Sequence, residues 1–499
     1  MNWDVIVVGG GGSGLATAVS AAEHGLRVLL LEKQRSLGGT TGIAVGSFTA
    51  NHTEFQARAG IEDTAEDHAH DAGLFAPAEI EERNNRELRR YFLDHAAETL
   101  QWLTRLGLNF HGPSPEPPNR VPRMHNVVPG ARAYITTLQT RFQQLGGVIL
   151  CNAGVERLVC QDHRIVGVVA IQFGKEQEFQ ARRGVVLAAG DYANSPELIK
   201  NFKGDRFAEI EGINPFSTGD GHRLAEQAGA RLINMDVTYG PELRFVPPSR
   251  RSFLNLLPTG GIATKLTGWL MPYVPKFVVN ALIRCLLVTW QHPENALFDD
   301  GAILVNQLGR RFCDERDSPS REVAIATQPG KLCYILLDQR LIQRYSAWPH
   351  FISTAPQIAY AYVDDYLRLR SDIAVRAGTL EAIAKRRGII ASSLQESIDS
   401  LNTQRRESKI APLEGRDWVL LGPAKAYFTT TEGGAAVNER FQVLNDQGTP
   451  IEGLYAVGQN GLGGQILWGH GLHIAWAMTS GRLCGRVLAG LAEPQEARD

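Results

Sequence analysis

The sequence predicts an α/β fold that opens with a parallel βαβ unit, and two observations near the N-terminus support this. Residues 4–8 form a short apolar run, as a buried parallel strand does, and a glycine-rich turn follows at once. Residues 13–24 are rich in alanine and end at Gly25, and a second apolar run covers 28–31. A strand, a helix and a strand in close succession are typical of one βαβ unit.

The turn after the first strand has the spacing of a dinucleotide-binding loop. Gly9, Gly11 and Gly14 fit G-x-G-x-x-G, in which glycine allows a tight turn, close approach of the backbone to a diphosphate, and packing of helix on strand. The helix that begins at Ser13 would direct its N-terminal amides at the diphosphate. Glu32 ends the second strand near the position of an acid that binds a ribose diol. A glycine-rich loop without a ligand is the alternative.

A second glycine-rich loop follows directly on Glu32 and Lys33. A plain NAD domain usually continues with another helix and strand, whereas an extended cofactor would run its flavin end over such a loop. This order therefore favours FAD over NAD. The candidate cofactor contacts here are Lys33, Gly38, Gly39, Thr40, Thr41 and Gly42.

Two later segments repeat the pattern of a buried strand that ends in a glycine turn. One covers residues 184–195 and includes Ala189 and Gly190. The other covers residues 453–459, ends at Gly458 and Gln459, and precedes a predicted helix from about 472 to 488.

Taken in order, these motifs resemble one known family, the FAD-dependent fumarate reductase/succinate dehydrogenase flavoprotein superfamily. The resemblance runs from residue 3 to about 490, and 477–481 is most similar to the 3-ketosteroid dehydrogenase branch, whose members desaturate a ring next to a ketone. The segments that carry it are Gly38–Gly46, Ala188–Gly190, Ser217–Gly221, Ile303–Asn306, Gly309–Glu315 and Leu454–Gly458.

The resemblance implies a Rossmann-like FAD-binding domain of the glutathione reductase type with an inserted α+β capping domain. Residues 1–235 and 430–499 would form the FAD-binding domain, and 236–429 the cap. FAD would lie at their junction without a covalent link, because Thr40 and Thr41 stand where succinate dehydrogenases attach flavin through a histidine. The contacts that the resemblance adds are Val155, Ala189, Gly190, Asp220, Gly458, Gln459, Leu472, His473 and Ile474.

The resemblance also implies hydride transfer between flavin N5 and a substrate carbon next to a carbonyl, which requires a proton carrier. Arg321 matches the arginine that serves fumarate reductases if two residues are inserted, and Ser320 falls roughly where the ketosteroid branch has a tyrosine. A solvated loop is the alternative. His470 and His473 lie near a helix start, where they would polarise a substrate oxygen or tune the flavin, or else pack and cap. Three tyrosines remain unranked as acids: Tyr192, Tyr239 and Tyr427.

The residues with which fumarate reductases clamp a dicarboxylate are absent. Gly240 and Thr430 replace histidines, and Leu467 or Trp468 replaces an arginine. A charged substrate without its charge partners loses much of its binding, so fumarate and succinate are not the expected substrates. We predict desaturation of an apolar cyclic ketone or ketosteroid-like compound. The alternatives are ene reduction, a non-catalytic flavin-binding subunit, and a flavin monooxygenase.

Composition excludes several other classes. Lys+Arg number 51 and Asp+Glu 53, which argues against nucleic-acid binding by bulk charge. No C-x-x-C is present, so electrons would pass through a diffusible quinone, oxygen or another carrier. No metal site is expected, since the two histidines of Asp67–Asp71 do not share a helix face. No signal peptide is recognised, which predicts a cytoplasmic protein. The apolar segment 253–290 predicts a cap core or subunit interface, or alternatively a lid that touches a membrane.

Overall fold

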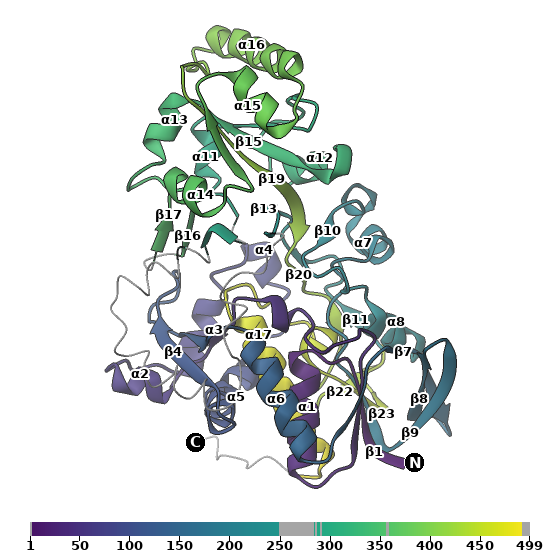
Figure 1. The fold of residues 1–499 in the computed structure, drawn as a ribbon. Coiled ribbons are helices and arrows are strands. Elements are labelled where there is room, and N and C mark those ends of the chain that lie inside the picture. The colour runs from purple at the N-terminus through teal and green to yellow at the C-terminus, as the bar shows by residue number, and fades with distance from the viewer. Residues whose placement is uncertain (1, 249–283, 285–286, 290–291, 356–358, 492–499) are drawn as a thin grey trace.

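The computed structural model describes residues 2–248, 284, 287–289, 292–355 and 359–491 of the 499-residue chain. The described elements gather into two bodies, drawn one above the other in Figure 1. The lower body contains the earliest and the latest elements of the chain, and the upper body contains the middle ones. The apolar segment 253–290 lies almost wholly outside the described residues, so its role stays a prediction.

The lower body is built on a sheet whose central five strands run parallel, in the order β6-β2-β1-β9-β23. The predicted βαβ unit is present, because β1 pairs with β2 in register from Val5↔Val28 to Val8↔Leu31. The late strand β23 pairs with β9, so both ends of the chain share one sheet. Its strands are β1 (Asn2–Val8), β2 (Val28–Leu31), β6 (Val148–Leu150), β7 (Ala153–Gln161), β8 (Arg164–Gln172), β9 (Lys175–Leu187), β22 (Gln442–Leu444) and β23 (Pro450–Ala456).

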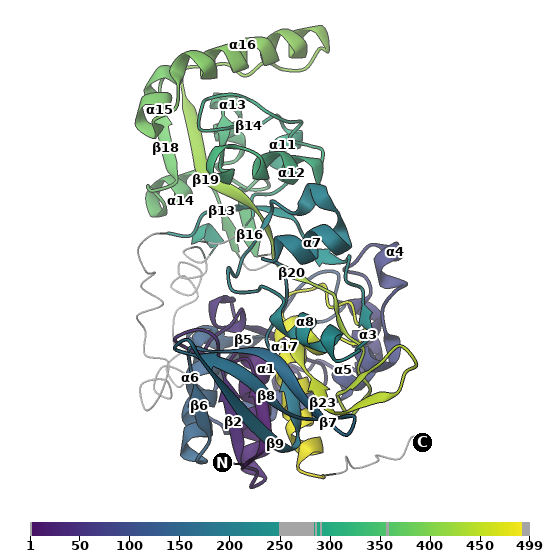
Figure 2. The same ribbon diagram turned by 90° about the vertical axis from the view of Figure 1, so that its right-hand side faces the viewer.

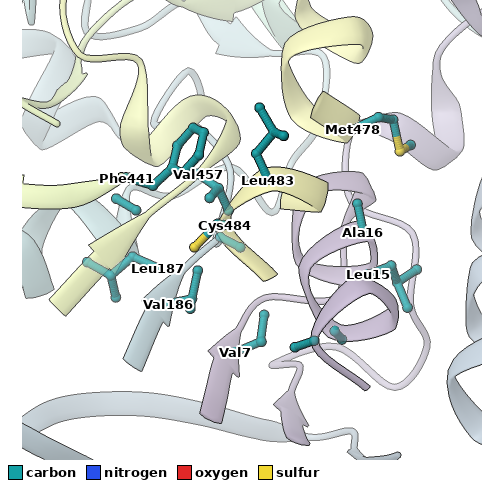
Figure 3. Close-up of a cluster of buried hydrophobic side chains, with 14 of the residues drawn as sticks. Val7, Leu15, Ala16, Val186, Leu187, Phe441, Val457, Met478, Leu483 and Cys484 are labelled. Atoms are coloured by element: carbon teal, nitrogen blue, oxygen red, sulfur yellow. The ribbon is translucent and has the colours of Figure 1, made fainter. Parts of the chain in front are cut away.

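Two helices from opposite ends of the sequence pack along each other beside this sheet. Small residues let α1 (Gly12–Glu23) and α17 (Leu472–Leu488) approach closely. A Cβ added at Gly481 would stand 2.4 Å from the Ser13 carbonyl oxygen. Figure 3 shows the apolar side chains of both helices meeting those of the strands beneath them. Flanking helices complete this layer: α6 (Arg132–Gln144) packs on α1, and α5 (Arg86–Arg105) packs on α17.

The upper body has its own sheet and its own apolar core. The long strand β19 (Trp418–Phe428) pairs with four others, and its apolar residues are almost all buried. Figure 2 shows helices packed around this sheet. The core also includes Leu198 and Phe207, which come from earlier in the chain. The other strands are β10 (Glu211–Gly212), β13 (Glu242–Phe245), β14 (Ile303–Val305), β15 (Cys333–Leu337) and β18 (Ala374–Ala377).

The remaining helices of eight or fewer residues, and one longer one, surround the two sheets. None of the described helices is long and apolar enough to cross a membrane. These remaining helices are α2 (Glu54–Arg58), α3 (Ala65–Ala72), α4 (Ala78–Glu81), α7 (Pro196–Lys203), α8 (Asp220–Gln227), α11 (Ala296–Asp299), α12 (Ser320–Ala326), α13 (Gln339–Arg344), α14 (Val363–Leu369), α15 (Leu380–Arg387) and α16 (Ala391–Glu407).

Short strand pairs join the two bodies where the chain passes between them. β12 (Thr238–Tyr239) leaves the lower body and pairs antiparallel with β20 (Thr430–Thr431), which returns to it. β11 (Leu232–Ile233) pairs in the same way with β21 (Gly434–Ala435). These two crossings hold residues near 239 and 431 side by side, which positions the site described below.

Candidate active site

The first glycine-rich turn has two of the features that a diphosphate loop requires. Gly9 has φ +111°, and a Cβ there would stand 2.3 Å from the Ala188 carbonyl oxygen. A Cβ at Gly14 would stand 1.9 Å from the Gly9 oxygen, so only glycine lets the helix pack this close. At Gly11 a Cβ would meet nothing nearer than the Gly39 Cα at 3.8 Å. A Cβ at Gly11 would therefore make only an ordinary van der Waals contact, so the protein itself does not require glycine at this position.

The start of α1 is left available to an anion. Gly11 is its N-cap residue, no side chain caps the first turn, and that turn contains no acidic residue. The first amides of a helix have no partner within the helix, and its dipole places positive potential there. The second loop lies alongside, since the Gly38 amide donates to the Gly10 carbonyl oxygen over 3.1 Å. Ser13 is buried within the first turn.

The carboxylate of Glu32 stands at the end of β2 and is held by the backbone. It accepts hydrogen bonds from the amides of Gly10 and Gln34, each at 2.8 Å. Lys33 next to it donates to Asp220 over 2.8 Å. Burial opposes ionisation of Asp220, but the ammonium of Lys33 holds the pKa of that carboxyl below its ordinary value. Val155 lies on β7, which begins beside Glu32.

The second loop is fixed by contacts on both sides. Asn214 donates to the Thr40 hydroxyl over 3.0 Å. The Thr41 side chain lies against Gly12 at the start of α1, and Gly42 faces Ile135 of α6. A Cβ at Gly38 would meet nothing within 4 Å, so this part of the loop borders open space.

The turns after β9 and β23 face each other through the side chain of Asn460. Its Oδ1 accepts from the Ala189 amide over 2.6 Å, and its Nδ2 donates to the Gly190 oxygen over 2.9 Å. The Ala189 amide is thus already used within the protein. Gly458 packs on Ser13, where a Cβ would meet the hydroxyl at 2.6 Å.

In the side-chain amide of Gln459, the nitrogen is hydrogen-bonded and the oxygen is not, within the part of the chain that the structure describes. Nε2 donates to the Thr430 hydroxyl over 2.6 Å and to the Thr431 carbonyl oxygen over 2.9 Å. Because a carbonyl only accepts, the orientation of the amide follows. Its Oε1 is buried without a partner among the described residues. An orphaned buried acceptor beside open glycine turns fits the hydroxyl-rich chain of FAD.

The start of α17 carries two histidine–glutamate pairs. Gly471, with φ +91°, is the N-cap, and no side chain caps the turn of Leu472, His473 and Ile474. His473 Nε2 lies 2.8 Å from Glu432 Oε1. Glu432 is fully buried, and its other oxygen accepts from the Leu467 amide over 3.0 Å.

The second pair joins His470 to Glu116. One carboxylate oxygen, Oε1, lies 2.5 Å from His470 Nδ1 and also accepts from the His470 amide over 2.7 Å. This bond to Glu116 raises the pKa of His470 above its ordinary value. The predicted helix start thus brings both histidines together, each on its own acid.

The two histidine–glutamate pairs form one cluster with Tyr239 on β12, with Glu242 and Arg244 on β13, and with Trp468 in the loop before α17. Tyr239 packs edge-to-face on Trp468 with ring centroids 5.5 Å apart. Burial, with the Glu242 carboxylate nearby, raises the pKa of Tyr239 far above its usual value, so the hydroxyl stays protonated. Arg244 lies 2.7 Å from Glu242. Burial opposes ionisation of Glu242, yet Arg244 holds its pKa below the ordinary value.

His292 connects this cluster to the upper body. Burial lowers the pKa of His292, and the charges that act on it are those of Glu242, Arg244, His470 and Arg321. All of these groups therefore lie within electrostatic range of one imidazole. Its Nδ1 is buried without a partner among the described residues.

Arg321 is buried and held on every side. Its guanidinium donates to Glu322 Oε1 through two nitrogens, at 2.6 and 2.8 Å, and to the Glu315 carbonyl oxygen over 2.9 Å. It also donates to Asn295 and lies over the Phe298 ring. Ser320 beside it is exposed at the start of α12. No described contact links Ser320 to the cluster.

Several members of the cluster were not singled out from the sequence: Glu116, Glu242, His292 and Glu432. Glu116 stands in a proline-rich stretch that predicts only a loop, and Glu432 follows the Thr430–Thr431 segment without a spacing rule of its own. Of the three unranked tyrosines, Tyr239 joins the cluster. Tyr192 is buried and donates to the Met235 carbonyl oxygen over 2.5 Å, and Tyr427 lies near Glu211.

The acidic and histidine-containing segment Asp67–Asp71 is occupied by ion pairs. Asp71 accepts from Arg120 and Arg123, and His68 contacts Asn51. Among the described residues no group of three or more His, Cys, Asp or Glu side chains could hold a metal ion.

Comparison with known proteins assigns the family. A model of the FAD binding domain family matches residues 4–268 and 274–466. A probable fumarate reductase of Shewanella frigidimarina is 26% identical over 96% of this chain and 74% of its own length. A vinyl phenol reductase of Lactiplantibacillus plantarum is 27% identical over 99% of this chain and 98% of its own.

Solved structures share the fold. A flavocytochrome c3 fumarate reductase in an open conformation superimposes with a TM-score of 0.72 at 24% identity, covering 98% of this chain and 78% of that one. A 3-ketosteroid dehydrogenase from Rhodococcus jostii gives 0.59 at 22% identity, covering 98% and 97%. At such identities the likeness concerns the fold alone.

The chain therefore belongs to the FAD binding domain family and, as predicted, to the FAD-dependent fumarate reductase/succinate dehydrogenase flavoprotein superfamily. Its cofactor is FAD, and it is an oxidoreductase that acts on CH–CH or C=C bonds. The particular nearness to the ketosteroid branch stays a prediction.

Proposed function

We propose that this protein reduces a C=C bond conjugated to a neutral polar group on an apolar, aromatic substrate. One observation carries the proposal: the cationic groups of the cluster each have a carboxylate beside them. Arg244 pairs with Glu242, Arg321 with Glu322, and His470 with Glu116. A dicarboxylate bound there would meet charges that are already balanced, whereas a neutral phenol or carbonyl would only need hydrogen bonds.

The proposed arrangement has a glutathione-reductase-type FAD-binding domain from residues 1–235 and 430–499, with residues 236–429 as the cap. The mixed α/β fold and the shared sheet of early and late strands support this division. FAD would bind without a covalent link at the junction. The proposed contacts are Gly9, Gly11, Ser13, Gly14, Glu32, Lys33, Gly38, Gly39, Thr40, Thr41, Gly42, Val155, Ala189, Gly190, Asp220, Gly458, Gln459, Leu472, His473 and Ile474.

The protein's own groups would divide the work at the junction. Reduced FAD supplies a hydride when it is bound. The amides at the start of α17 offer positive potential to the flavin edge that becomes anionic on reduction. Tyr239, which stays protonated, would donate a hydrogen bond to the polar group of the substrate, and Trp468 would pack against its ring.

Reduction is favoured over desaturation by the relatives. Two relatives that align with 96% and 99% of this chain are named reductases, and one of them, matched over 98% of its own length, is a vinyl phenol reductase. Desaturation of a cyclic ketone, our expectation from the sequence, is the same bond chemistry in reverse and stays the competing prediction. For electrons we propose a diffusible carrier, a quinone, oxygen or NADH; relatives named for NADH support the last.

The test is flavin reoxidation. The holoenzyme is reduced anaerobically with dithionite and then mixed with 4-vinylphenol, fumarate, urocanate or 4-androstene-3,17-dione. The proposal expects 4-vinylphenol to restore oxidised flavin absorbance while fumarate leaves it bleached. Bleaching of oxidised enzyme by a saturated ketone, together with no reoxidation by any alkene, would establish the desaturase instead.

A further inference from the structure

We propose that His470, positioned by Glu116, delivers the proton to the second carbon of the reduced bond. This rests on the proposed function and names the group that completes its reaction. Glu116 acts as a positioning residue, since it contacts His470 and not the reacting atoms.

Glu116 fixes the histidine through both of its donors. One oxygen receives the ring Nδ1 at 2.5 Å and the backbone amide at 2.7 Å, so the ring orientation and the backbone are held together. The carboxylate itself is buried, with 6% of its side chain exposed. Because Nδ1 is hydrogen-bonded to Glu116, Nε2 is the ring nitrogen that can carry a proton to the substrate.

The second ring nitrogen of His470, Nε2, has no hydrogen-bond partner among the described residues. The side chain is 56% exposed. The histidine directly precedes Gly471, the N-cap of α17, at the helix end proposed to face the flavin. A proton on Nε2 is therefore available to a substrate that packs on Tyr239 and Trp468.

The two other proton candidates are less available. His473 uses its Nε2 on the fully buried Glu432. Arg321 is 5% exposed, and all three of its nitrogens donate to oxygens of the protein. A guanidinium also gives up a proton only at very high pH. Both histidines have one bonded ring nitrogen and one without a partner among the described residues, but 56% of the His470 side chain is exposed against 23% of the His473 side chain.

The charges around His470 favour its protonated form. Glu116 raises the pKa of His470; burial lowers it, Glu242 raises it and Arg244 lowers it. His292 also lies in electrostatic range, and its own pKa is lowered by burial. The imidazolium is the form that a proton donor needs.

The proposed reaction adds one hydride and one proton across the C=C bond. One carbon of the C=C bond gains a hydride, with its electron pair, from the reduced cofactor. The other carbon gains H⁺ from His470 Nε2, whose N–H bond breaks and whose imidazolium becomes neutral. Water in the exposed junction then returns a proton to Nε2. The substrate is reduced by two electrons, and the cofactor is oxidised by two.

The experiment measures reoxidation of the dithionite-reduced holoenzyme by 4-vinylphenol from pH 5.5 to 9.5. His470→Asn is expected to slow it about 100-fold or more. Glu116→Gln is expected to shift the alkaline fall in rate to lower pH. The same shift should appear in the NMR titration of the labelled His470 ring in the oxidised holoenzyme. Glu54→Gln, in an exposed pair with Arg58 on α2, is the matched control and should change neither result.

Two failures are distinguishable. If wild type is not reoxidised by any alkene, the proposed function fails, and the proton proposal falls with it. If wild type is reoxidised but His470→Asn and Glu116→Gln keep its rate and pH profile, only the proton proposal is overturned. Loss confined to Arg321→Lys, with both of those variants unaffected, would assign the proton to Arg321.

Discussion

The starts of α1 and α17 resemble each other, yet only at α1 could the groups around the helix start be predicted from the sequence. Both helices begin after glycine, neither has a side-chain cap, and neither has an acid in its first turn. At α1 the neighbouring groups come from the same local motif. At α17 the functional partners, Glu116 and Glu432, come from two distant segments. Site residues that are neighbours in the sequence can be predicted from a local motif, whereas site residues that only the fold brings together cannot.

The largest effect is expected from a substitution at the start of α1. Gly14→Ala places a Cβ 1.9 Å from the Gly9 carbonyl oxygen, a backbone atom that cannot rotate away. We expect a cost of about 3 kcal/mol or more in unfolding free energy and a protein without FAD. The flavin-to-protein absorbance ratio and a thermal melt measure both.

Gly130→Ala is the control for that change. A Cβ there would meet nothing within 4 Å. Full flavin content in Gly14→Ala as well would show that the loop is not the diphosphate site.

A smaller effect than at α1 is expected from a substitution at the start of α17. Gly471→Ala meets both φ +91° and a contact of 2.6 Å with the Thr49 hydroxyl, so the first turn must shift. FAD should remain bound, because the diphosphate loop is intact. Moving the helix amides should lower the flavin midpoint potential by about 10–40 mV, the size of a helix-dipole contribution of about 0.5–2 kcal/mol. A dye-coupled redox titration checks this, and an unchanged potential would separate α17 from the flavin.

The smallest effect is expected on the pH dependence of stability, through the His470–Glu116 pair. The folded-state pKa of His470 lies above its unfolded value, because Glu116 bonds the ring. The stability this pair contributes is fully present below the unfolded pKa of about 6.5 and is lost as pH rises through the folded pKa. Since the ring is half exposed, we expect only about 0.5 kcal/mol. Urea melts of wild type and Glu116→Gln should differ at pH 6 and converge at pH 9; a constant gap would contradict the charge pairing.

The sequence was sufficient where chemistry depends on neighbours in the chain. Strand β1, the glycine turn, α1 and Glu32 follow from local patterns, and the helix predicted from 472 to 488 is the α17 observed. Glu116 could not be found in this way, since proline-rich spacing predicts only a loop. The pairing of Glu432 with His473 likewise depends on where β20 returns to the lower body.

The shared sheet has a consequence for how the protein is made. The phosphate loop beside β1 is synthesised before β23, which joins its sheet, and before α17, which packs on α1. A nascent chain on the ribosome therefore holds half of a nucleotide site with its apolar side uncovered. We therefore expect FAD to bind after these late segments have been made and, once bound, to stabilise the folded chain.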